Sequence, residues 1–75
     1  MEINEKRSDE FIKRVRKLGF MQTELGILLG KSARCISFYM TKTRNVPTVV
    51  WARLNDLEEL PRERLCKIIA KAKNG

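Results

Sequence analysis

The residues of this chain with the clearest chemical capacity are the basic side chains between Lys31 and Thr48. Lys31, Arg34, Lys42 and Arg44 fall in this segment, and no Asp or Glu interrupts them. The whole chain has 16 Lys and Arg against 9 Asp and Glu, a formal charge of +7 that favours polyanions. The segment therefore indicates a nucleic-acid contact, and the alternative at this point is a solvated loop that happens to be basic.

The residue types that catalysis or metal binding needs are scarce. The sequence has no His, no Gly-rich phosphate loop, and no Ser or Cys beside a suitable base. Cys35 and Cys66 fit no metal-binding spacing and are too few for a disulfide framework, so we expect each to be a small buried apolar residue. We expect no enzymatic activity, no metal, no cofactor and no small-molecule substrate.

The elements that must position the basic segment are predicted to be helices. Residues 1–7 are expected to fray, after which Ser8 caps a first helix that Gly19 ends. Two short helices follow, one from about Gln22 to Leu29 and one from Ala33 to about Met40. The apolar stripe of the first helix would be Phe11, Ile12, Val15 and Leu18.

The turn between the two short helices has its own signals. Gly30 can supply the left-handed residue that stops one helix, and Ser32 can cap the next. Helices this short are not stable alone, so the core must hold them. The second would turn Cys35, Ile36, Tyr39 and Met40 inward and leave Ala33, Arg34, Ser37 and Phe38 outward or lateral.

The rest of the chain completes a single all-α domain of five helices over residues 8–73. Thr41 to Val46 is expected to be a loop, Pro47 opens a fourth helix, and Pro61 opens the fifth. A chain of 75 residues supports only one core. The inward face of the fourth helix would be Val50, Trp51, Leu54 and Leu57, with Trp51 partly buried. The inward face of the fifth helix would be Leu65, Ile68, Ile69 and Ala72, and Asn74 and Gly75 would end that helix.

The apolar faces of the fourth and fifth helices are larger than a lone domain of this size needs, so we expect a homodimer that pairs through these two helices. The first ten residues lack the apolar core of a signal peptide, and no apolar run approaches the roughly 18 residues of a membrane span. We therefore expect a cytoplasmic protein with no membrane partner.

Three runs of residues resemble the helix-turn-helix of the lambda-repressor/Cro-type (XRE) DNA-binding family: Gln22 to Gly26, Leu29 to Ser32, and Ile36 to Tyr39. In this motif Gly26 lets the third helix approach closely, Gly30 supplies a positive φ, and Ile36 locks the two helices together. The resemblance covers about residues 11–57 and implies a lambda repressor-like fold.

The resemblance makes the helix from Ala33 to Met40 the recognition helix, which would enter the major groove of double-stranded operator DNA. Arg34 would bond guanine O6 and N7, a contact worth roughly 1 to 3 kcal/mol of discrimination. Ala33 and Phe38 would meet thymine methyls, and Ser37 would bond a base. The implied set is completed by Gln22 and Ser32 at helix N-termini and by Lys42, Thr43, Arg44 and Asn45 on phosphates.

The chain departs from the family at several positions. Val15 and Met40 stand where many members pair an Arg with a Glu, and exchanging both charges for apolar groups avoids a lone buried charge. Met21 replaces the usual Ser or Thr cap, a loss of about 1 kcal/mol. Lys31 stands where an apolar residue is common, and the loop after Met40 lacks its usual Gly, which alters the phosphate contacts.

The resemblance implies a small transcriptional regulator, a phage- or plasmid-type repressor or autoregulator that binds an inverted repeat as a homodimer. The alternative is a protein-interaction module, antitoxin-like or a small phage protein, that uses the C-terminal helices. A membrane-surface role for the last helix is disfavoured by Glu63 on its wet face and by its lack of aromatics. RNA binding is also disfavoured, because the sequence shows neither strands with aromatic residues for base stacking nor a clamp motif for single strands.

Overall fold

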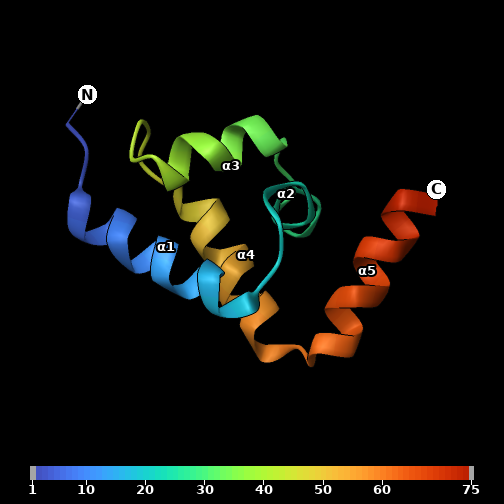
Figure 1. Cartoon of the computed structure of the whole chain (residues 1–75). Helices are drawn as coiled ribbons and strands as arrows, with labels where there is room; N and C mark the ends of the chain where they lie inside the picture. Colours follow the sequence, from blue (N-terminus) through green and yellow to red (C-terminus); the bar gives the residue numbers. More distant parts are fainter. Residues whose placement is uncertain (1, 75) are drawn as a thin grey trace.

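The chain folds into five helices, and residues 2–74, which the structure describes, contain no strand (Figure 1). This computed structural model confirms the predicted all-α class, and no described helix is long and apolar enough to cross a membrane. Gly75, predicted to end the last helix, lies outside the described residues. The helices are α1 Glu5–Leu18, α2 Gln22–Leu29, α3 Ala33–Met40, α4 Thr48–Glu59 and α5 Arg62–Asn74.

The first helix starts earlier than predicted. Asn4 is its N-cap, and the side-chain Oδ1 of Asn4 accepts a hydrogen bond of 3.2 Å from the backbone N–H of Arg7. Ser8 lies inside α1 with only 1% of its surface exposed. The predicted cap at Ser8 is therefore wrong, and Glu5 to Arg7, which were expected to fray, belong to α1, because Asn is as good a cap as Ser and the Glu5 carboxylate suits the first turn.

A short turn joins α2 to α3 and passes directly over Gly26. Gly30 has φ +72, and the N–H groups of Gly30 and Lys31 both donate to the Gly26 carbonyl, the second at 2.8 Å. A Cβ on Gly26 would lie 2.5 Å from the Lys31 carbonyl oxygen and 3.4 Å from the Ala33 nitrogen. The structure thus confirms the left-handed conformation of Gly30 and the close approach at Gly26.

Phe11 of α1 forms the centre of the core and is fully buried. Its ring meets Tyr39 and Trp51 edge-on, with centroids 5.9 and 5.6 Å away, a favoured aromatic geometry. Trp51 is partly buried, as predicted, and Ile36 and Tyr39 attach α3 to the core. The cluster also contains Val15, Leu25, Leu28, Leu29, Val46, Val50, Leu54, Leu57, Leu65 and Ile69, and Met40 packs against it.

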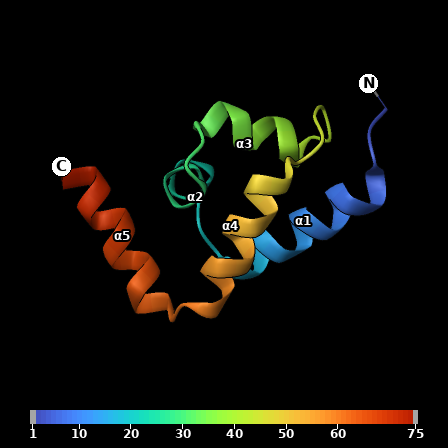
Figure 2. The same cartoon turned by 180° about the vertical axis from the view of Figure 1, so that it is seen from behind.

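α5 packs mainly against α2 and extends away from α1 and α4 (Figures 1 and 2). Leu65 and Ile69 are buried and Ile68 is half-buried, in agreement with the sequence. Ala72 and Cys66 are exposed, so the prediction that both are buried is wrong. The reason is that α5 buries only one narrow stripe, two residues spaced by one turn.

Several arginines hold the helices together. Arg53 Nε donates to the Leu28 carbonyl at 3.0 Å, and Arg62 donates to the Leu18 carbonyl at 2.6 Å, so both satisfy helix C-termini. Arg14 of α1 pairs with Glu58 of α4, which raises the pKa of Arg14 and lowers the pKa of Glu58. These contacts tie α1, α2, α4 and α5 together.

Tyr39 is expected to make stability fall at high pH. Its burial, helped by the Cys35 thiol 3.2 Å from its hydroxyl, raises the pKa of Tyr39 to about 12. The unfolded chain, with an ordinary pKa of about 10, loses this proton first. The free energy of unfolding is therefore unaffected below about pH 10 and falls by on the order of 1–3 kcal/mol toward pH 12.

Urea unfolding at about pH 9 and at about pH 11.5 measures this fall. Tyr39 is the only tyrosine, so phenolate absorbance follows its titration directly. Tyr39→Phe keeps the ring and removes the titrating group, and we expect it to lose the extra pH dependence. If the free energy of unfolding of Tyr39→Phe fell equally between the two pH values, the effect would belong to other residues.

Candidate nucleic-acid interface

α3 lies along one edge of the molecule in both views (Figures 1 and 2). Ser32 caps it as predicted, its Oγ accepting a hydrogen bond of 3.1 Å from the Cys35 N–H. Ile36 and Tyr39 are buried on the inner face. The core therefore fixes α3 through one face and leaves the other toward solvent.

The four predicted base-facing residues reach solvent on this outer face. Arg34 is exposed, and Ala33, Ser37 and Phe38 are half-exposed. Within residues 2–74, Arg34 forms no ion pair and no cation–π contact. An unpaired guanidinium with five donors is the best-suited side chain for a planar acceptor pair such as the guanine edge.

The loop after α3 folds back onto the end of the helix. Thr43 and Arg44 both donate backbone hydrogen bonds to the Phe38 carbonyl, at 2.9 and 3.3 Å. Lys42 has φ +61 and so takes the left-handed position that a glycine usually fills. The Oγ1 atoms of Thr41 and Thr43 lie 2.8 Å apart. The loop therefore has a defined shape without the expected glycine.

Two of the predicted phosphate ligands have partners inside the protein. Lys42 forms an ion pair with Asp9 of α1, and this carboxylate raises the pKa of Lys42. Asn45 accepts from the Asn4 N–H and donates to the Glu2 carbonyl, both at 2.8 Å. Asn45 thereby fastens the start of the chain to the loop. No local pattern indicates these contacts, because 41 and 43 residues separate Asn45 from its partners.

The start of α2 also faces solvent. Gln22 is exposed, and Met21 provides no side-chain cap, as predicted. The Glu24 Oε1 accepts from the Met21 N–H at 2.9 Å and so compensates for part of the missing cap. Lys73 of α5 lies 3.7 Å from the other oxygen of Glu24. The basic end of α5 is therefore close to the first turn of α2.

Exposed Arg34, the half-exposed outer side chains of α3 and the loop that follows thus share one edge of the fold. The chain matches no protein-family model, no curated protein and no solved structure.

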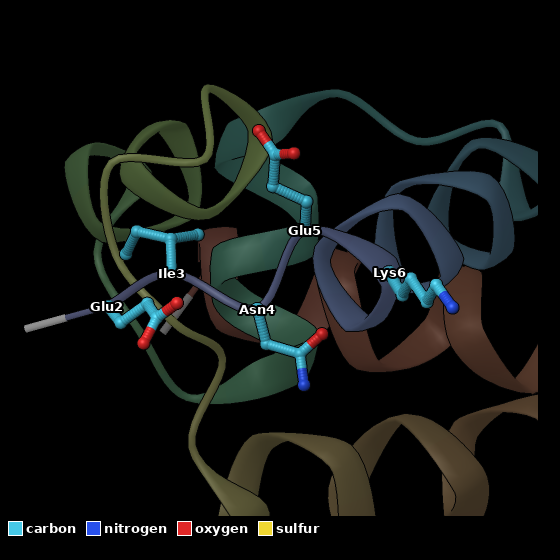
Figure 3. Close-up of a pocket in the computed structure, with 5 residues that line it drawn as sticks. All are labelled: Glu2, Ile3, Asn4, Glu5 and Lys6. Carbon is cyan, nitrogen blue, oxygen red and sulfur yellow. The ribbon is translucent and has the colours of Figure 1, made fainter.

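A hollow of about 430 Å³ lies along the start of the chain (Figure 3). The side chains around it point in different directions rather than toward one centre. Among residues 2–74, no three His, Cys, Asp or Glu are placed to hold a metal ion. The hollow is lined by Glu2, Ile3, Asn4, Glu5 and Lys6. It lacks the apolar lining with a few convergent polar groups that is typical of a small-molecule site.

Proposed function

We propose that this protein is a small transcriptional regulator that binds specific sequences in double-stranded DNA. α2 and α3 act as a helix-turn-helix, and α3 enters the major groove. The observation that carries the proposal is Arg34, exposed and unpaired on a helix that Ile36 and Tyr39 fix to the core. The family resemblance of residues 22–39 supports the same function.

The dimensions of α3 suit this role. An α-helix with its side chains is about 10–12 Å in diameter, which matches the major-groove width of about 12 Å, and the 8 residues of α3 extend about 12 Å along its axis. Its N-terminal turn places a positive helix end and the Arg34 side chain together. A formal charge of +7 adds sequence-independent attraction to phosphates. The helix therefore combines a base-contacting group with general affinity for the duplex.

We propose further that the protein binds an inverted repeat as a homodimer and represses by blocking polymerase or regulates its own gene, as in phage- or plasmid-type repressors. A 75-residue chain reads only a few base pairs by itself, and pairing two copies on symmetric half-sites doubles the contacts. This arrangement also buries apolar surface that a core this small leaves uncovered.

A mobility-shift titration with the DNA upstream of the protein's own gene tests the proposal. We expect the complex to persist in about 0.2 M salt, with affinity on the order of 10³-fold higher than for random duplex. The matched control is a duplex of the same length and base composition with a shuffled sequence. Equal binding of the two duplexes, lost alike as salt rises, would favour the protein-interaction alternative.

A further inference from the structure

The Arg44 guanidinium is stacked on the Phe38 ring at the end of α3. Its Cζ lies 4.5 Å from the ring centroid, within the roughly 6 Å range of a cation–π contact. The Phe38 carbonyl also accepts the backbone N–H of Thr43 at 2.9 Å and of Arg44 at 3.3 Å. Phe38 therefore holds Arg44 through both its main chain and its side chain.

This contact changes what each side chain can offer to DNA. The guanidinium covers one face of the Phe38 ring, whereas its N–H donors lie in its own plane and remain free to bond. Phe38 follows Arg34 by four residues, so the two are neighbours on one face of α3. The stacked Arg44 therefore lies beside the outer face that Arg34 occupies.

Arg44 is also the most available cation of the loop. Lys42 is paired with Asp9, and the Asn45 amide is bonded to the start of the chain. Arg44 is exposed and forms no ion pair with any of residues 2–74. A guanidinium held in one orientation loses less freedom when it bonds a phosphate.

We propose that Phe38 is a positioning residue: its ring holds Arg44 as a fixed ligand for a backbone phosphate beside the groove that Arg34 enters. Phe38 thus acts through Arg44, in place of the predicted contact with a thymine methyl. This inference rests on the proposed function and refines it, because it assigns the phosphate contact of the loop to one residue.

A double-mutant cycle tests the inference, with affinity measured by fluorescence anisotropy on a duplex selected by the wild type. We expect Arg44→Ala to bind about 10-fold more weakly per half-site, a typical loss for one charge-assisted hydrogen bond, and the losses below are likewise per half-site. Phe38→Leu should weaken binding about 5-fold, and the double variant about 10-fold rather than about 50-fold. Both single variants should lower the slope of log affinity against log salt by about one unit per half-site.

Control variants separate positioning from folding. Phe38→Trp keeps an aromatic face and should bind within about twofold of the wild type. Phe38→Met is a second variant without a ring and should repeat the result of Phe38→Leu. Phe20→Leu removes a matched stack, Arg62 over Phe20 at 4.7 Å, and should leave affinity unchanged. Thermal unfolding of each variant reports its stability separately.

Two results would overturn the inference, because each would mean that Phe38 contacts DNA itself. One is a double variant whose loss is the product of the two single losses. The other is a changed base preference in Phe38→Leu with an unchanged salt dependence. Failure of the wild type to prefer any duplex is a different result and would overturn the proposed function instead.

Discussion

We expect Gly26→Ala to lower the free energy of unfolding by about 3 kcal/mol, the upper end of the usual cost of overpacking. The added Cβ would lie 2.5 Å from the Lys31 carbonyl oxygen and 3.3 Å from the Ser32 carbonyl carbon. Both are backbone atoms that cannot rotate aside, so the turn itself must move. Domains of this kind have about 5–15 kcal/mol of stability in total. Urea denaturation measures this loss of stability, and we expect the midpoint to fall while the dependence of the unfolding free energy on urea concentration stays the same. DNA affinity should also fall, because α3 is displaced.

Gly30→Ala is the matched control for this prediction. A Cβ on Gly30 meets nothing within 4 Å, but the backbone has φ +72, so the cost is conformational strain of about 1–2 kcal/mol. Gly26, inside α2 beneath the turn, and Gly30, in the turn itself, therefore separate lack of space from lack of conformational freedom. A loss in Gly30→Ala as large as that in Gly26→Ala would show that the close approach at Gly26 is not what requires glycine.

We expect Arg34→Ala to reduce the preference for specific over random duplex by about 5- to 150-fold per half-site. This range corresponds to roughly 1–3 kcal/mol, the discrimination that a bidentate arginine contact to guanine provides. Arg34 is exposed and has no internal partner among residues 2–74, so its removal should leave stability nearly unchanged. Competition between selected and shuffled duplexes measures the ratio directly.

Arg16→Ala controls for the lost charge. Arg16 is another exposed arginine, on α1, and its removal should weaken binding to both duplexes alike through the general electrostatic field of the protein. Arg34→Lys keeps the charge but lacks the planar fork, so it should lose most of the preference. An unchanged ratio in Arg34→Ala would show that Arg34 does not contact bases.

The parts of the fold that local signals determine were predictable. α2 and α3 have the predicted bounds because Gly30 and Ser32 end one helix and begin the next within three residues. Pro47 and Pro61 directly precede α4 and α5 for the same reason, since proline suits a helix start. The outward placement of Arg34 followed from the apolar spacing of Ile36 and Tyr39.

The parts that depend on distant partners were not predictable. Ser8 and Asn4 are both acceptable caps, and the bond from the Asn4 N–H to Asn45 ties the chain down at Asn4. Cys66 and Ala72 have apolar side chains, but their burial depends on how much of α5 the rest of the fold covers. The pairing of Lys42 with Asp9 likewise joins α1 to the loop, and neither residue signals the other in the sequence.

We propose above all that the outer face of α3 recognises base sequence in double-stranded DNA. Selection of bound duplexes from a random pool by the wild-type chain tests it most directly. We predict an enriched site with two related half-sites about 34 Å apart, each with a guanine that Arg34→Ala no longer selects. Enrichment of no sequence, with binding to every duplex lost equally as salt rises, would contradict the claim.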